Sequence, residues 1–146
     1  MEDYYENLDL IDLISERHVQ LRKIIEKLWN ENGEIYISNS EWFILARIDQ
    51  YNEPTVSCLT KSVDITRQAT HKFIKSLKSK GLVEVNNVKN NKKEKYVTLT
   101  EFGKECLTKY LKVKEDLEAK IAEKIGLEQV EKLKELLRTE WDLKPL

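Results

Sequence analysis

The sequence predicts a mainly α-helical fold that carries one small β-hairpin, with the element order α-α-α-α-β-β-α-α. Apolar residues recur at helical spacing along most of the chain. The chain has only 4 glycines and 2 prolines among its 146 residues, too few for the frequent turns of an all-β sandwich. Between residues 82 and 99, two short β-prone runs flank a polar, turn-rich stretch, which indicates the hairpin.

Composition argues against several classes of protein. Hydrophobic residues make up 40% of the chain and charged residues 35%, which is enough for a core beneath a heavily charged surface. Cys58 and Cys106 stand far apart without a CxxC spacing, and His18 and His71 are isolated, so we expect no disulfide scaffold, metal ion or cofactor. We expect a cytoplasmic protein with no membrane partner, because no apolar run reaches roughly 18 residues and the first residues are acidic.

Helical periodicity and capping signals predict the first two helices. Apolar residues at helical spacing predict a long helix over residues 8–29, which Gly33 brings to an end. Ser38 and Glu41, three residues apart, form a capping-box signature for a second helix over residues 38–50.

Two threonines predict the starts of two further helices. Thr55 is an N-cap candidate for a short helix over residues 56–62. Thr66 caps a fourth helix that runs to Lys80, and Gly81 ends it as a C′ glycine.

The rest of the chain predicts the hairpin and two more helices. The β-prone runs 82–85 and 96–99 are joined by a polar, basic tip at residues 86–94. Helical periodicity then returns over residues 101–125 and 128–142.

Charge is distributed unevenly along the chain. Residues 1–60 carry 5 basic and 12 acidic side chains, a net of −7, whereas residues 61–95 carry 10 basic and 3 acidic side chains, a net of +7. Residues 96–146 carry 10 basic and 11 acidic side chains, a net of −1. The positive block is a candidate surface for a polyanion, and a merely solvated lysine-rich face is the alternative.

Three short helices followed by a hairpin indicate a winged helix-turn-helix. The last of these three helices is the second of the helix-turn-helix pair, the one that enters the major groove of DNA. The corresponding helix, residues 66–80, is the most basic one, and the hairpin tip is the next most basic element. We therefore predict a single chain in which residues 35–100 form a DNA-binding lobe. Residues 7–31 and 101–146 form a helical dimerisation region, because their apolar stripes exceed what one small lobe can cover.

The basic helix supplies most of the candidate DNA contacts. Arg67 and Gln68 have the side chains that read guanine and adenine edges, while His71 reads a base or contacts a phosphate. Ser57 and Thr66 are candidates for phosphate contacts through their hydroxyls, with helix capping as the alternative role. Four lysines are candidate phosphate contacts, with free solvent exposure as the alternative: Lys72, Lys75, Lys93 and Lys95.

Three segments resemble the MarR family of regulators. Residues 65–83 (ITRQATHKFIKSLKSKGLV) resemble the recognition helix of that family. Residues 96–103 (YVTLTEFG) resemble the end of its wing, and residues 37–45 (ISNSEWFIL) resemble its second helix. The resemblance implies a homodimer on a pseudo-palindromic DNA site and places Asn91 among the wing residues that contact DNA.

The wing departs from the family pattern. The family carries an Asp-x-Arg signature where this chain has Asn91, Lys92 and Lys93. Lysine is a more strongly hydrated point charge than arginine and makes no planar fork, so Lys93 should insert less readily into a narrow minor groove.

The resemblance also implies a pocket for a small aromatic effector. The candidate lining residues are Arg17, Trp29, Tyr36 and Trp42, and core packing is the alternative role for the three aromatic residues. A thiol that senses oxidants is an alternative to the effector pocket as the source of the signal, although the first 57 residues contain no cysteine.

These observations favour a homodimeric, sequence-specific regulator of transcription that represses by covering a promoter. A winged-helix module that binds another protein remains an alternative. No enzyme is expected, because the four glycines are not clustered and no nucleophile, base and orienting group can be assembled.

Overall fold

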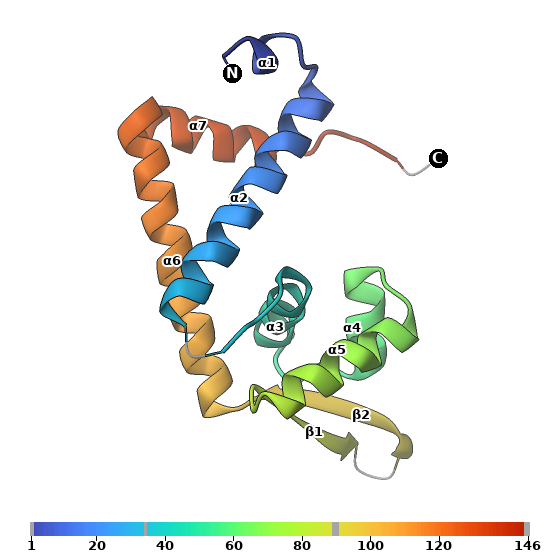
Figure 1. Cartoon of the computed structure of the whole chain (residues 1–146). Helices are drawn as coiled ribbons and strands as arrows, with labels where there is room; N and C mark the ends of the chain where they lie inside the picture. The colour runs from blue at the N-terminus through green and yellow to red at the C-terminus, as the bar shows by residue number, and fades with distance from the viewer. Residues whose placement is uncertain (1, 34, 89–90, 145–146) are drawn as a thin grey trace. The chain divides into compact units, whose positions relative to one another are not determined.

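The computed structural model describes residues 2–33, 35–88 and 91–144, and for residues 2–3, 32, 88 and 91–93 it describes the backbone only. It divides the chain into two compact units, an N-terminal unit (Met1–Tyr110) and a C-terminal unit (Leu111–Leu146). The elements, coloured along the chain in Figure 1, are α1 (Glu2–Glu6), α2 (Leu10–Asn32), α3 (Asn39–Tyr51), α4 (Val56–Val63), α5 (Arg67–Ser79), β1 (Val83–Val88), β2 (Asn91–Leu99), α6 (Glu101–Ile125) and α7 (Leu127–Arg138).

Side-chain caps start the three helices that precede the hairpin. Ser38 Oγ accepts a hydrogen bond from the backbone N–H of Glu41 at 3.2 Å, and the Glu41 carboxylate accepts one from the backbone N–H of Ser38 at 3.1 Å. Thr55 accepts from the N–H of Cys58 at 3.1 Å, and Thr66 accepts from the N–H of Ala69 at 3.0 Å. The predicted starts of α3, α4 and α5 are therefore confirmed.

The helices differ from the prediction near both ends of the chain. A short helix, α1, precedes the first predicted one. At the other end of the chain, α7 ends at Arg138 rather than reaching residue 142. The hydroxyl and the N–H of Thr139 both donate to the carbonyl of Glu135, at 2.8 and 3.1 Å, which closes the last turn. The indole of Trp141 then folds back to donate to the carbonyl of Leu136 at 3.0 Å, so its helical spacing was misleading.

The hairpin is longer than the β-prone runs suggested. The antiparallel register runs from Val83 opposite Leu99 to Asn87 opposite Lys95, and it shifts between Asn87 and Val88. Polar residues that were predicted to form a long tip thus belong to the paired arms. They can do so because a two-stranded ribbon is solvated and does not need an apolar face along its whole length.

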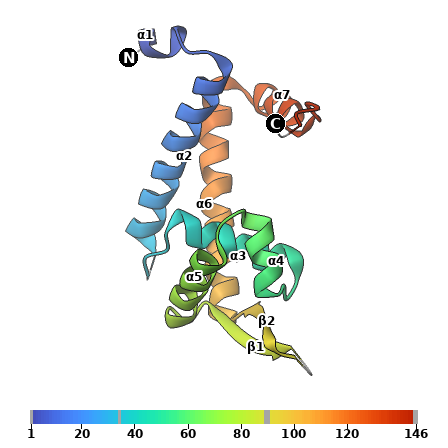
Figure 2. The ribbon, with the colours of Figure 1, turned by 90° about the vertical axis from the view of Figure 1, so that its right-hand side faces the viewer.

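The core of the N-terminal unit lies among α3, α4, α5 and the base of the hairpin, which Figures 1 and 2 show gathered together. Figure 2 also shows the hairpin projecting beyond these helices. An isolated bridge between Thr55 and Tyr96, with a 2.9 Å hydrogen bond from Val97 N–H to Pro54 carbonyl, fixes the hairpin to the start of α4. The largest fully buried apolar side chains are Trp42, Ile37, Ile44, Leu45, Ile48, Leu59, Leu77, Leu82, Val83 and Val97.

The first turn of α6 lies against the start of the hairpin. The Thr100 hydroxyl donates to the carbonyl of Gly81 at 2.6 Å and accepts from the N–H of Gly103 at 3.0 Å. A Cβ atom on Gly103 would stand 2.1 Å from the carbonyl oxygen of Leu82, so only glycine permits this approach.

The C-terminal unit consists of the later part of α6 and α7. Lys134 on α7 forms an ion pair with Glu118 on α6, and Val130 is buried. Large apolar side chains in this unit remain exposed, at Leu111, Ile125, Leu127, Leu133, Leu136, Leu137, Trp141 and Leu143. Across the described part of the chain, none of the helices combines the length and the apolar character that a bilayer crossing requires.

Candidate nucleic-acid interface

Helix α5 presents one buried face and one basic face. Thr70, Ile74 and Leu77 are buried against the core of the N-terminal unit. The other side of the helix is exposed and carries Arg67, Gln68, His71, Lys72, Lys75 and Lys78. The predicted base-reading and phosphate-binding residues of this helix therefore share an accessible face.

A hollow of about 240 Å³ lies between α5 and the hairpin. Its polar lining is mostly cationic, and Glu94 adds one carboxylate. The lining residues are Val56, Arg67, His71, Ile74, Lys75, Lys78, Val85, Glu94 and Lys95. The fold thus brings Arg67, His71 and Lys75, predicted on the helix, together with Lys95, predicted on the wing. Lys78 joins them, and its helical spacing from Lys75 was the signal that could have added it to the candidates.

The other candidates lie around this hollow rather than in it. Gln68 and Lys72 are exposed on α5, and Ser57 is half-buried in the first turn of α4. Thr66 is exposed, and its hydroxyl oxygen caps α5. The side chains of Asn91 and Lys93 lie outside the part of the chain that the structure describes.

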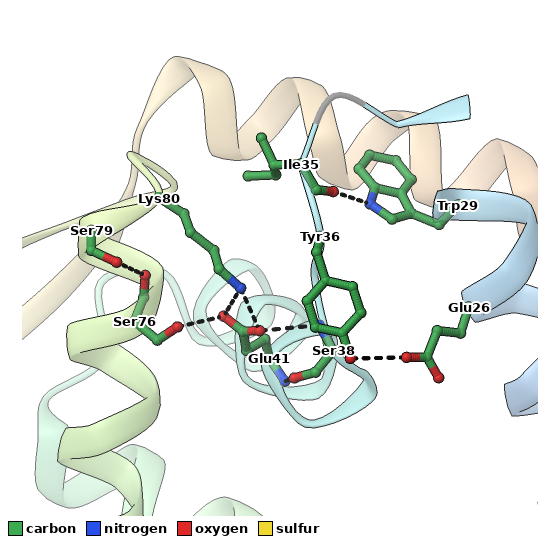
Figure 3. Close-up of polar contacts among 9 residues, drawn as sticks. All are labelled: Glu26, Trp29, Ile35, Tyr36, Ser38, Glu41, Ser76, Ser79 and Lys80. Carbon is green, nitrogen blue, oxygen red and sulfur yellow. Dashed lines mark hydrogen bonds and ion pairs between the residues drawn. The ribbon is translucent and has the colours of Figure 1, made fainter. Parts of the chain in front are cut away.

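One lysine of the positive block faces inward. Lys80 Nζ donates to both carboxylate oxygens of Glu41, at 2.7 and 2.8 Å (Figure 3). Burial opposes ionisation of Glu41, but hydrogen bonds from Lys80, from the Ser38 backbone and from Ser76 outweigh it and lower the pKa of the carboxyl. Sequence reasoning found Glu41 only as a capping residue, because nothing in the spacing of residues 41 and 80 links them.

A second and larger pocket, of about 440 Å³, lies in the N-terminal unit beside α2 and α3. Its walls are apolar, with several cationic or polar groups at the rim. It is lined by His18, Val19, Arg22, Lys23, Asn39, Ser40, Phe43, Ile44, Val63, Ile65 and Phe73. The amide oxygen of Asn39 is buried and has no hydrogen-bond partner among the described residues.

The residues proposed from sequence for an effector site do not line this pocket. Trp29 and Trp42 are core residues whose rings meet edge to face, and Trp42 stacks on Tyr110 with ring centroids 3.8 Å apart. Tyr36 is exposed and donates to Glu26 at 3.0 Å. Arg17 is also exposed; it donates to Gln20 at 2.8 Å and lies over the ring of Tyr5.

Sequence reasoning missed most of the pocket residues. Its one candidate on the polar side of α2 was Arg17, and it did not include Arg22 or Lys23 about one helical turn further along. Because α2 carries charged and polar residues along its whole length, no local pattern distinguished Arg22 and Lys23 from the others. The two cysteines do not line the pocket: Cys58 is exposed on α4 and Cys106 is buried on α6.

Known proteins share this fold. The model of the MarR family matches residues 37–95, which include α3, α4, α5 and most of the hairpin. No curated protein sequence matches the chain.

Solved structures match nearly the whole chain. The reduced form of MarR from E. coli is 21% identical with a TM-score of 0.78, and the match covers 90% of this chain and 95% of that one. A mutant of the same protein in complex with operator DNA is 22% identical with a TM-score of 0.74, covering 92% and 95%.

MepR, a transcription regulator of the multidrug efflux pump MepA in Staphylococcus aureus, is 16% identical with a TM-score of 0.71, and the match covers 89% of this chain and 94% of that one. Residues 37–95 thus match the MarR family model, and the chain has the winged-helix fold of the MarR and MepR regulators.

Proposed function

We propose that this protein is a sequence-specific regulator of transcription that binds double-stranded DNA in the cytoplasm. The observation that carries the proposal is the basic face of α5, which continues into the cationic hollow beside the hairpin. A helix that is buried on one side and basic on the other can lie in the major groove, with the hairpin reaching the adjacent backbone. Structures of MarR and MepR with DNA support the same reading.

Each side chain has a distinct role in this proposal. Arg67 and Gln68, at the start of α5, read guanine and adenine edges through bidentate hydrogen bonds. Lys72, Lys75 and Lys95 contact phosphates and so position the helix without reading sequence. His71 lies in the same hollow as Lys75 and Lys95 and contributes a base or phosphate contact.

The proposal includes a homodimer. Apolar side chains are exposed at the start of α2, at Leu10 and Ile11, and along α7, at Leu133, Leu136 and Leu137. Exposed apolar surface of this extent is typical of an interface between subunits. Two symmetry-related lobes would bind half-sites about one helical turn, or roughly 10 bp, apart and would repress by covering a promoter.

A small aromatic anion is the proposed effector, bound in the 440 Å³ pocket. The apolar side chains Phe43, Ile44 and Phe73 suit an aromatic ring, and Arg22 and Lys23 suit a carboxylate. The unpartnered amide oxygen of Asn39 could accept a hydrogen bond from a ligand hydroxyl. Binding would shift the population of lobes that are competent to bind DNA.

The test starts with selection of bound duplexes from a random library, followed by titration of the selected and a scrambled duplex at several salt concentrations. If each subunit neutralises about four phosphates, the slope of log affinity against log salt should be near −7 for the dimer. Failure to bind any duplex at low salt would contradict the proposal and favour a protein-binding module.

A separate titration tests the effector. Benzoate should weaken binding of the selected duplex by the parent but not by Arg22→Ala.

A further inference from the structure

A charged cluster inside the N-terminal unit is separate from the proposed DNA contacts. Its interpretation rests on the proposed DNA binding. We propose that Glu41 and Lys80 are positioning residues, which hold α5 in the orientation that lets its first turn read base edges. In this proposal Lys80 makes no contact with DNA, although it belongs to the most basic stretch of the sequence.

The geometry of the cluster is that of a filled carboxylate site. The Glu41 carboxylate accepts hydrogen bonds from Lys80 Nζ at 2.7 and 2.8 Å, from Ser76 Oγ at 3.0 Å and from the Ser38 backbone N–H at 3.1 Å (Figure 3). The side chain of Glu41 is only 5% exposed and that of Lys80 is 24% exposed. Charge-assisted hydrogen bonds of this length in a mostly buried place strongly favour one arrangement of their partners.

The cluster joins two helices at defined places. Glu41 lies in the first turn of α3, whereas Ser76 and Lys80 lie in the last turn and at the C-cap of α5. Near its other end, α5 is attached to α4 by a 3.0 Å hydrogen bond between the hydroxyls of Thr60 and Thr70. The recognition helix is therefore held by polar bonds near both of its ends, in addition to its apolar packing.

Because α5 is long, a small change in its orientation at the Lys80 end moves its first turn at the other end. At 1.5 Å per residue, Lys80 lies about 20 Å along the axis from the start of the helix at Arg67. If the attachment at Lys80 is lost, α5 can pivot about its buried middle, and its first turn then moves relative to the lobe. Bidentate contacts with base edges need correct placement, whereas phosphate contacts by long lysines tolerate movement.

The ammonium group of Lys80 is further enclosed by an aromatic ring. It lies 5.4 Å from the centroid of the Tyr36 ring, within the range of a cation–π contact. The hydroxyl of Tyr36 donates to Glu26 on α2 at 3.0 Å, so the cluster continues from α5 through Tyr36 to α2. The charge of Lys80 is balanced within the protein, which leaves it little attraction for a phosphate.

Two interpretations of Lys80 predict opposite effects of Glu41→Gln. If Lys80 were a phosphate contact restrained by Glu41, removing the carboxylate charge would strengthen binding to all DNA and steepen the salt dependence. If the pair positions α5, Glu41→Gln should instead lower the ratio of affinities for the selected and scrambled duplexes, with an unchanged salt slope.

The experiment titrates the full-length parent and the variants Glu41→Gln, Lys80→Met and Lys80→Arg against the duplex recovered by selection and its scrambled form. We expect Glu41→Gln and Lys80→Met each to lower the affinity ratio about tenfold, the size of one lost base contact. Lys80→Arg should retain most of the ratio, because a guanidinium can also bind both carboxylate oxygens.

Lys78→Met is the matched control, since Lys78 lies two residues away and lines the cationic hollow. It should weaken both duplexes by similar factors and flatten the salt slope by about one unit per subunit. An affinity ratio that is unchanged in folded Glu41→Gln and Lys80→Met, or a slope that flattens in Lys80→Met as it does in Lys78→Met, would overturn the proposal.

Folding of each variant is checked by circular dichroism before titration. If Glu41→Gln or Lys80→Met does not fold, Ser76→Ala decides, because it removes a single donor to Glu41 and should lower the ratio about threefold; an unchanged ratio there would overturn the proposal. A parent protein that binds no duplex would instead contradict the proposed function, so the two failures are distinguishable.

Discussion

Arg67 and Gln68 begin α5 with exposed side chains of the two types that read purine edges. Arg67→Ala or Gln68→Ala should cost about 1–3 kcal/mol of binding free energy on the selected duplex. Each should also relax base preference at particular positions while leaving scrambled-duplex binding much less affected. Competition titration with single-base variants of the selected duplex checks this. Equal losses on selected and scrambled DNA would remove these residues from base reading.

The buried pair of Glu41 and Lys80 should also govern stability and its pH dependence. Lys80→Met leaves the Glu41 carboxylate in a buried site without its main partner, which should destabilise the fold by about 3 kcal/mol at neutral pH. The pKa of Glu41 is lowered from its ordinary value of 4.5, so in the parent this stabilisation is present above that value. It is lost as pH falls through the lower pKa of the folded state.

The measurement is urea unfolding of parent and Lys80→Met at a series of pH values. The gap in free energy of unfolding should be largest near neutral pH and should narrow below pH 4.5. A gap of constant size across this range would show that the loss comes from packing of the lysine stem rather than from its charge.

At the scale of single elements, the approach of α6 to the hairpin depends on one glycine. Gly103→Ala would place a Cβ atom 2.1 Å from the backbone carbonyl oxygen of Leu82, so α6 or the hairpin must move. We expect a loss of about 1–3 kcal/mol in the free energy of unfolding, as for other overpacked sites.

Gly81→Ala is the matched comparison for this prediction. Gly81 has a positive φ of 77°, but no atom lies within 4 Å of a Cβ built there. The free energy of unfolding that Gly81→Ala loses should therefore reflect backbone strain alone, about 1 kcal/mol. Thermal unfolding of both variants checks the pair; a smaller loss for Gly103→Ala than for Gly81→Ala would contradict the steric argument.

The elements that could be predicted are those whose ends are set by contacts between residues close together in the sequence. Ser38, Thr55 and Thr66 each mark a helix start through a side chain and an N–H three residues away, so a short stretch of sequence is sufficient. The predicted end of α7 was wrong, because Trp141 continues the helical spacing of apolar residues although its indole caps the preceding turn. The predicted arms of the hairpin were too short, because polar residues also pair in the strands there.

The parts of the site that could not be predicted depend on long-range packing. The exposed basic face of α5 follows from helical periodicity, and so the sequence was sufficient to place Arg67, Gln68 and Lys75 on that face; their contacts with DNA stay a prediction. Lys80 is 39 residues from Glu41, and no local pattern distinguishes it from the lysines around it. The pocket beside α2 likewise depends on how α2 and α3 pack, which placed Trp29 and Trp42 in the core instead.

At the scale of the whole molecule, exposed apolar side chains carry the prediction of a dimer. Leu136 is 55% exposed in the single chain. Leu136→Glu should bury an unpaired charge in the proposed interface and so dissociate the dimer. Sedimentation equilibrium at micromolar concentration should give a dimer for the parent and a 17.3 kDa species for the variant.

Gln129→Glu is the control for the dimer prediction, because it adds the same charge on α7 at an exposed polar position. It should leave the dimer intact. A parent that sediments as a 17.3 kDa species would contradict the prediction directly, as would a variant Leu136→Glu that remains dimeric.

The two-stranded hairpin has a consequence for the behaviour of the protein in a crowded solution. A sheet of only β1 and β2, joined to the rest of the described chain by the bridge at Tyr96, leaves open edges along its outer arms. Open edges are templates on which further chains can add as strands and begin aggregation. The sequence places Lys89, Lys92, Lys93 and Lys95 in this region. Mutual repulsion between such arms opposes strand addition, so the same lysines that suit a phosphate backbone also protect the free protein from aggregation through its sheet edges.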